Sequence, residues 1–249
     1  MLNFLRKKHA VATDYTGIAM DIHAHLIPGI DDGPKVMEES LELIRGLESL
    51  GYRRLTATPH VMSDYYPNSR DYILESHQKL LAAVKAAGID MEIGVAAEYY
   101  MDSQFLSIIE NEEVLTLPNN QVLMEMSFVS PPPNLYHFVF RLQTKSYQPV
   151  LAHPERYLFL KKNFHEYERL KEHGVRFQLN ILSLTGHYGH PVAEMGWKLL
   201  KSGMIDYAGT DVHHLRHVEI LREALQDKRI AQTLLEYPFL NAELGATLA

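Results

Sequence analysis

Short apolar runs alternate with longer segments of helical period along most of this chain. The apolar runs have the length of strands, and the segments between them place apolar residues three or four positions apart, as at positions 37, 41, 44 and 47. The expected strands span residues 18–22, 54–58, 91–97, 121–124, 149–152, 175–179 and 205–208. The expected helices span residues 35–50, 69–87, 102–110, 135–146, 163–173 and 191–202, with one or two closing helices over 219–235. Strands that alternate with helices predict a parallel α/β sheet.

The number of repeats bears on the form of that sheet. About seven strand–helix units suit a closed, TIM-like (β/α)7-type barrel better than an open doubly wound sheet. No Gly-x-Gly-x-x-Gly follows the first strand, which argues against a dinucleotide-binding sheet. No linker or low-complexity segment interrupts the pattern. We therefore expect an N-terminal tail at residues 1–17 and a single barrel domain at residues 18–249.

Composition narrows the class of protein. The 249 residues are 46% hydrophobic and 22% charged, as in ordinary globular proteins, and the net charge of −7 provides no basic stripe for nucleic acid. The chain has no cysteine, which excludes a disulfide framework, a thiolate zinc site and a cysteine nucleophile, and fits a cytoplasmic location. No apolar run is long enough to span a bilayer. Phe4, Leu5 and the basic residues 6–8 could touch an anionic membrane surface weakly, although a plain basic tail is the favoured interpretation.

His23 and His25 follow the first apolar run directly. Residues i and i+2 of a strand point to the same face, so both imidazoles can reach one metal ion. A His-x-His pair by itself is weak support for a metal site, because such pairs also occur on ordinary surfaces.

Further polar residues stand at the end of nearly every expected strand. In a barrel these ends share one rim, where active sites form. Any one of these residues could close a turn or form an ion pair, but charged groups directly after so many apolar strands are costly unless they are paired or ligated. Two or three divalent ions are expected, since the donors are too many for one. The candidate ligands are His23, His25, Asp32, His60, Glu98, Glu125, His153, Asp211 and His213.

The chemistry of these donors and of two nearby arginines suggests a reaction. Imidazole and carboxylate ligands without sulfur suit manganese, iron or zinc and do not discriminate among them. Arg156 and Arg216 should lie near the same rim, where a guanidinium could hold a phosphate; a surface ion pair is the alternative for each. Asp211 and His213 are also candidates for protonating a leaving group.

The ordered motifs resemble those of the polymerase and histidinol phosphatase (PHP) superfamily, in particular its bacterial protein-tyrosine phosphatases of capsule and exopolysaccharide synthesis. The resemblance covers residues 18–240. It implies a distorted βα barrel, ligand roles for the nine candidates, a metal cluster usually satisfied by manganese, and a phosphotyrosine-bearing tail of a bacterial tyrosine kinase as substrate. It does not extend to the tail, and the spacing around Arg216 differs. The motifs are Asp-Ile-His-Ala-His, Asp-Asp-Gly-Pro, Thr-Pro-His, Ala-Ala-Glu-Tyr-Tyr, Leu-Met-Glu-Met-Ser, Leu-Ala-His-Pro-Glu-Arg-Tyr and Thr-Asp-Val-His-His.

The leading hypothesis is metal-dependent hydrolysis of a phosphomonoester, with phosphotyrosine in protein as the favoured substrate. Direct attack by a metal-bound hydroxide is expected, because a cysteinyl-phosphate intermediate is impossible in this chain. The alternatives are a small-molecule phosphatase of the histidinol-phosphate kind, a metal-dependent nuclease or amidohydrolase on a similar barrel, and a metal-loaded binding module without turnover. The sequence leaves the oligomeric state open.

Overall fold

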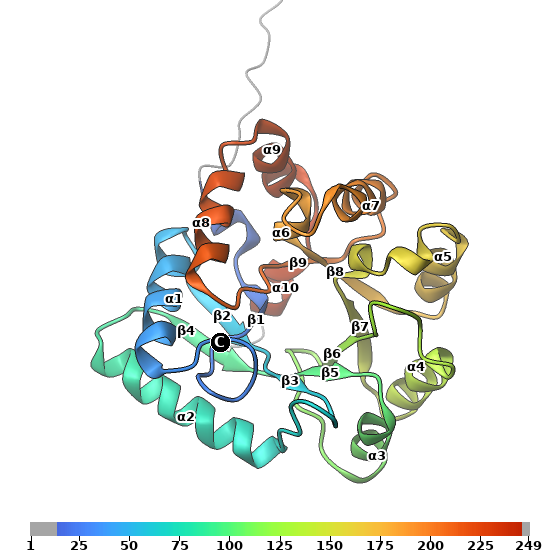
Figure 1. The fold of residues 1–249 in the computed structure, drawn as a ribbon, viewed down its shortest axis with the longest axis horizontal. Coiled ribbons are helices and arrows are strands. Elements are labelled where there is room, and N and C mark those ends of the chain that lie inside the picture. Colours follow the sequence, from blue (N-terminus) through green and yellow to red (C-terminus); the bar gives the residue numbers. More distant parts are fainter. Residues whose placement is uncertain (1–13, 246–249) are drawn as a thin grey trace, which may run out of the picture.

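The computed structural model describes residues 14–245 of the chain. Strands gather around the middle of the molecule and helices lie outside them (Figure 1). The predicted α/β domain of parallel strands is confirmed, because every strand pairing among the described residues is parallel.

The strands of residues 14–245 form two hydrogen-bonded groups. One has three strands in the order β1-β2-β4, and the other has six in the order β3-β5-β6-β7-β8-β9. The strands are β1 (Asp21–Ala24), β2 (Arg54–Ala57), β3 (His60–Val61), β4 (Glu92–Val95), β5 (Glu98–Tyr100), β6 (Gln121–Glu125), β7 (Gln148–Ala152), β8 (Arg176–Asn180) and β9 (Tyr207–Gly209).

The second and third expected strands are present as β2 and β4, and each is followed by a further short strand that was not expected. β2 gives way to β3 and β4 to β5, with a short break between them. Pro59 lies in the first break, where it has no N–H to contribute to a ladder. Its carbonyl oxygen still accepts the N–H of Glu98 at 3.0 Å. The breaks make His60 and Glu98 the first residues of β3 and β5, where they stand opposite each other in register.

The first strand lies beside the segment that follows the last strand. The N–H of Asp211 donates to the carbonyl oxygen of His23 at 2.7 Å, and the N–H of His25 donates to that of Val212 at 2.9 Å. The two strand groups therefore meet here, and the carboxyl end of β1 faces the residues after β9.

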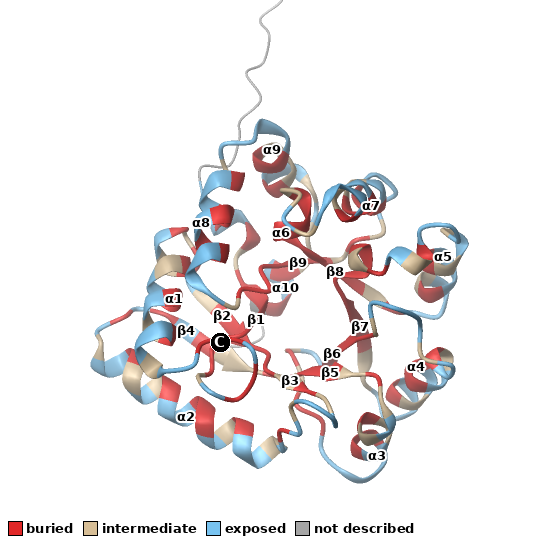
Figure 2. Ribbon diagram, viewed as in Figure 1, coloured by how far each residue is buried: buried red, intermediate tan, exposed pale blue. Residues whose placement is uncertain are grey.

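The helices cover the outer side of the strands. Most are buried along the side that faces the strands and exposed along the other (Figure 2). The predicted helices are present, with the segment 219–235 shared by two helices as one of the two expected forms; α6 and α10 were not expected. The helices are α1 (Met37–Ser49), α2 (Arg70–Ala86), α3 (Ser103–Asn111), α4 (Leu135–Thr144), α5 (His165–Glu172), α6 (Ile181–Leu184), α7 (His190–Lys201), α8 (Leu215–Ala224), α9 (Lys228–Glu236) and α10 (Asn241–Gly245), with 3-10 turns at Thr16–Ile18, Pro154–Arg156 and Leu158–Leu160.

A small cluster of buried apolar side chains lies apart from the main hydrophobic core. Met20, Ile22 and Leu123 belong to this small cluster, and Leu244 of α10 joins it. The Asn241 side chain fixes α10 in place: its Nδ2 donates to the carbonyl oxygens of residues 20 and 208 at 2.9 and 2.7 Å, and its Oδ1 accepts the N–H of residue 208 at 3.0 Å. The sequence had suggested no structure after residue 235.

The domain begins earlier than the sequence indicated. Tyr15 was assigned to the tail, but its side chain is buried, stacks on Tyr52 with ring centroids 5.4 Å apart, and donates to the carbonyl oxygen of Leu221 at 2.7 Å. The expected membrane contact falls on residues 4–8, outside the described residues. None of the helices within residues 14–245 combines the length and hydrophobicity needed to cross a bilayer.

Candidate active site

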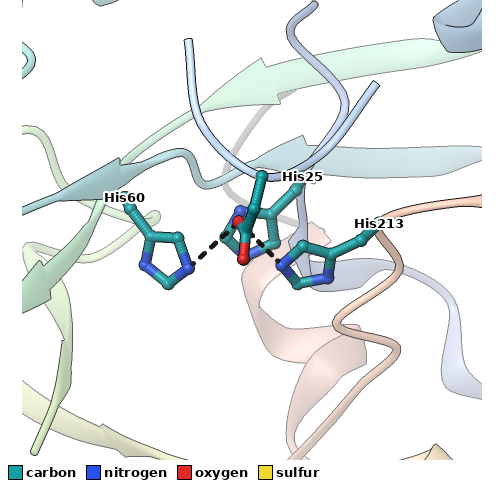
Figure 3. A group of neighbouring side chains, drawn as sticks. His25, His60 and His213 are labelled. Carbon is teal, nitrogen blue, oxygen red and sulfur yellow. Dashed lines mark ion pairs between the residues drawn. The ribbon is translucent and has the colours of Figure 1, made fainter. Parts of the chain in front are cut away.

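The structure brings all nine candidate ligands together, although His60 and Glu98 begin the short strands β3 and β5 instead of standing at strand ends. Each of them belongs to at least one group whose donor atoms lie within 4.8 Å of one another. Figure 3 shows the rings of His25, His60 and His213 facing a common point. The groups among the described residues are His25, Asp32, His60 and His213; His23, Glu98 and His153; His23, His25 and Asp211; and His60, Glu98 and Glu125.

The four groups share members. His23, His25, His60 and Glu98 each belong to two of them. Side chains that serve two neighbouring donor groups are the usual arrangement of a multinuclear site, in which carboxylates bridge adjacent ions. The geometry therefore fits more than one cation.

Glu98 is the centre of the cluster and is fully buried. Its Oε1 lies 3.1 Å from the His153 ring, and its Oε2 lies 3.2 Å from the nearest nitrogen of both His23 and His60. Oε2 makes no well-directed hydrogen bond within residues 14–245. A buried carboxylate oxygen surrounded by imidazole nitrogens without directed hydrogen bonds fits a place for a metal ion.

The cluster attracts positive charge strongly. Burial alone would lower the pKa of His60, but Glu98 and Glu125 raise it to about 9. Burial likewise disfavours the charged form of His25, yet Asp31, with Asp211 and Glu98, raises its pKa well above the ordinary value. Burial would raise the pKa of Glu98, whereas the surrounding imidazoles hold it well below its usual range. The carboxylates therefore stay ionised although they are buried, and their negative charge favours the binding of cations in the cluster.

Two of the imidazoles are oriented by residues that the sequence analysis did not select. His23 Nδ1 lies 2.8 Å from Oε1 of Gln178, and His25 Nδ1 lies 2.8 Å from Oδ2 of Asp31. Both partners are acceptors, so each Nδ1 carries the hydrogen and each Nε2 is left free for a metal. Asp31 could have been found beside Asp32, but nothing distinguishes Gln178 from other polar residues of a strand.

Backbone strain marks two of the candidate ligands. His153 has φ of +35° and Asp211 has φ of +53°, a region that side chains other than glycine seldom adopt. His153 follows directly on β7, and Asp211 comes two residues after the end of β9. Strain of this kind persists where the surrounding structure enforces it, and it concentrates at functional sites.

Arg156 reaches the cluster and is held between two aromatic rings. Its guanidinium carbon lies 4.4 Å from the centre of the Phe128 ring and 4.2 Å from that of Tyr188. One guanidinium nitrogen donates to Oδ2 of Asp211 at 3.0 Å, and Asn180 donates to the same oxygen at 2.8 Å. A cation fixed in this way is ready to meet an anionic group without reorganising.

Arg216, unlike Arg156, does not reach the cluster. Its side chain is exposed and pairs with Glu219 on its own helix at 2.9 Å. It lines a neighbouring hollow with Lys35 and Leu215, which Asp32 and His213 also border, and it does not line the cleft above the cluster. The structure therefore contains the surface ion pair that was the alternative to a phosphate-binding role for Arg216.

The cleft above the cluster has a volume of about 400 Å³. Tyr66, Phe128 and Tyr188 contribute aromatic walls, and His214 and His217 line it as well. His217 was not among the candidate site residues. In the structure its Nδ1 accepts the N–H of His213 at 3.2 Å, and burial, followed by the charges of His214 and His213, lowers its pKa to about 3. His217 is therefore a neutral acceptor that supports the His213 backbone.

The comparisons with known proteins bear on this site. The model of the CpsB/CapC family of capsular polysaccharide synthesis matches residues 19–226. The tyrosine-protein phosphatase YwqE of Bacillus subtilis is 27% identical over 198 residues, which are 79% of this chain and 78% of YwqE. The tyrosine-protein phosphatase CpsB of Streptococcus pneumoniae is 26% identical over 202 residues, 79% of this chain and 83% of CpsB.

The fold of this chain is also similar to a solved structure of the same group of proteins. That structure comes from crystal structures of YwqE from Bacillus subtilis and CpsB from Streptococcus pneumoniae, described as unique metal-dependent tyrosine phosphatases. The superposition has a TM-score of 0.75 at 25% identity and covers 88% of this chain and 94% of the other. The residues matched by the family model, 19–226, include the whole cluster.

Proposed function

Because the chain belongs to the CpsB/CapC family of capsular polysaccharide synthesis, we propose that it is a metal-dependent protein-tyrosine phosphatase. One observation carries the proposal: nine imidazole and carboxylate side chains converge beneath a cleft that also holds a fixed arginine. The relatives that cover most of the chain are phosphatases of this kind.

Two or three divalent ions, with manganese favoured over iron or zinc, are proposed for the cluster. His25, Asp32, His60 and His213 would hold one ion, and the groups around Glu98 and Asp211 would hold the others. Bound ions would supply Lewis-acid charge and lower the pKa of a water molecule to near neutrality. The mixture of nitrogen and oxygen donors suits manganese, iron or zinc.

Arg156 is proposed to bind the phosphate. Its planar guanidinium offers donors in the fork geometry that matches phosphate oxygens, and its ring neighbours stop it from turning away. Charge that develops on phosphate oxygens during displacement is stabilised without movement of the protein.

Asp211 is better suited to accepting hydrogen bonds than to donating a proton. Burial would raise its pKa, but His23, His213 and Arg156 keep it well below the usual range. The carboxylate is therefore ionised when it accepts from Arg156 and Asn180. A phenol has a pKa of about 10, so a phenolate needs less help to depart than an alkoxide. His213, proposed above as a ligand with its Nδ1 2.9 Å from the carbonyl oxygen of Asp211, would likewise have no proton to donate while it holds a metal ion.

The walls of the cleft favour an aromatic substrate. Tyr66 stacks on His60 with ring centroids 5.5 Å apart, and Phe128 stands on the Arg156 side. A phosphotyrosyl ring can lie against these faces while its phosphate meets the arginine. We propose that the substrate is the phosphotyrosine-bearing tail of a bacterial tyrosine kinase in capsule or exopolysaccharide synthesis, dephosphorylated in the cytoplasm.

The test is turnover of a phosphotyrosine peptide by purified protein with added manganese, alongside metal analysis. Manganese should stimulate the rate, a chelator should abolish it, and His153→Ala should lose most of it. Faster turnover of histidinol phosphate would favour a small-molecule phosphatase, and hydrolysis of DNA or an amide with phosphotyrosine untouched would favour the nuclease or amidohydrolase class. Full activity of the His153→Ala variant would contradict the ligand assignment.

A further inference from the structure

A second hollow, of about 790 Å³, lies outside the catalytic cleft. It is bounded by α7, by the start of α9 and by the segment that joins α6 to α7 (Figure 1). We refer to it as the α7–α9 groove. Its lining residues that matter here are Lys161, Gly186, Glu194, Trp197, Lys198 and Arg229.

The α7–α9 groove carries an excess of positive charge in a chain of net charge −7. Lys161 is neutralised by Glu194, at 2.9 Å. Within residues 14–245, no ion pair with a carboxylate is found for Lys198 or Arg229. Two cations remain available to a ligand.

Aromatic rings hold both of these cations in place. The Arg229 guanidinium lies 3.7 Å from the centre of the Trp197 ring, and the Lys198 ammonium lies 3.8 Å from that of Phe164. A cation over an aromatic face keeps its charge and loses part of its freedom, so less entropy is lost when an anion binds it. The groove is therefore prepared for negative charge.

One segment separates the α7–α9 groove from the catalytic cleft. Residues 184–186 and 190 line the groove, whereas Tyr188 lines the cleft and stacks on Arg156. An extended peptide covers about 3.3 Å per residue, so a few residues suffice to pass from one side of this segment to the other. On the far side of Gly186 a smaller hollow carries Glu223 and Asp227, which would repel an acidic chain and favour the groove.

We infer that the α7–α9 groove binds an acidic segment of the protein whose phosphotyrosine occupies the catalytic cleft. Carboxylates of that segment would pair with Arg229 and Lys198, and its backbone would lie against the indole of Trp197. The inference rests on the proposed function, since it assigns the groove to a region of the same substrate. Charge complementarity selects this occupant, because neutral or basic segments gain nothing from two unpaired cations.

Binding can be measured without catalysis, because Trp197 is the only tryptophan of the chain. An unphosphorylated peptide with a run of glutamates should change the fluorescence of Trp197 in a saturable, salt-sensitive way, and the same peptide with glutamines should not. The double variant Lys198→Glu/Arg229→Glu should lose the response. Lys201→Glu, a matched charge reversal on the same helix outside the groove, should keep it. An equal response to both peptides, or a response that survives the double variant, would overturn the inference.

Kinetics separate this inference from the proposed function. For a phosphotyrosine peptide with acidic flanks, the double variant should raise KM by about tenfold, roughly threefold per reversed charge, with kcat unchanged. Turnover of a small aryl phosphate should be unaffected, which also shows that the variant is folded. Activity on phosphotyrosine with no preference for acidic flanks would refute the groove and leave the phosphatase intact. Fluorescence binding without phosphatase activity would refute the proposed function and leave an acidic-peptide site.

Discussion

The Nε2 atoms of His23 and His25 lie 3.4 Å apart in the buried cluster. In the neutral form that ligates a metal, each ring carries its hydrogen on Nδ1, toward Gln178 and Asp31, so neither Nε2 can donate to the other. Two lone pairs at this separation repel each other unless a positive charge lies between or beside them. Their partners thus prepare both rings as ligands.

Gln178 should control metal affinity through the tautomer of His23. Gly209 leaves room for the Gln178 side chain, because a Cβ atom at position 209 would lie 2.6 Å from the Gln178 amide nitrogen and 2.9 Å from His23 Cβ. Replacing Gln178 by Met removes the acceptor, and manganese affinity should fall by about 10- to 100-fold, as is typical for the partners of ligand histidines. Gln178→Glu retains an acceptor and should bind more tightly than the Met variant. Equal affinities of the two variants in a metal titration would contradict this role.

The convergence of the nine donors could be predicted because strand topology determines it. Residues such as His60 and Glu98 follow apolar runs directly, and the carboxyl ends of parallel strands meet whatever the details of packing. The α/β class followed from the same alternation.

Side-chain direction and support could not be predicted in the same way. The position of Arg216 near the rim was evident, but its partner was not: Glu219 lies one turn along the same helix and holds the guanidinium in solvent. His217 entered the cleft because α8 begins at Leu215 and turns that ring back toward His213, and no pattern in the sequence specifies this. Asn241 looked like part of a frayed end, although three hydrogen bonds tie it to the bottom of the strands.

Metal removal should destabilise the domain. Without cations the four carboxylates Asp32, Glu98, Glu125 and Asp211 are balanced only by the surrounding imidazoles and, at Asp211, by Arg156. At a free metal concentration about a hundredfold above Kd, binding contributes about 2.7 kcal/mol, which corresponds to a rise in Tm of roughly 5–10 °C for a domain of this size. Thermal unfolding with a chelator, then with manganese restored, measures the shift. Magnesium is the control and should stabilise less, since it prefers oxygen ligands; an identical Tm with chelator and with manganese would contradict a buried metal cluster.

The two arginines should differ sharply in their effect on catalysis. Arg156→Ala should lower kcat by about 10²- to 10³-fold, the loss typical of a single group that stabilises developing charge. Arg216→Ala removes an exposed pair and should change kcat/KM by less than about twofold. Steady-state kinetics on a phosphotyrosine peptide compare the two, with circular dichroism to confirm folding. A similar loss in both variants would show that Arg216 moves into the cleft when substrate binds.

His77 should make stability depend on pH at a distance from the metal cluster. Its ring is buried on α2 and its Nε2 donates to the carbonyl oxygen of Ile93 at 3.0 Å; burial lowers its pKa below the ordinary 6.5. The unfolded chain therefore takes up a proton at a higher pH than the native one. The stability that neutral His77 provides is fully present above about pH 6.5 and is lost as the pH falls through the lower native pKa.

The variant His77→Gln can donate to the same carbonyl oxygen but does not titrate. The free energy of unfolding of the wild type should fall more steeply than that of His77→Gln between about pH 7 and about pH 5, because only the wild type binds an extra proton on unfolding there. Urea unfolding at several pH values, with manganese saturating at each, isolates the difference, since the histidines of the cluster are common to both proteins. Parallel pH profiles would mean that His77 is protonated equally in the native and unfolded states, which its burial beside Ile93 argues against.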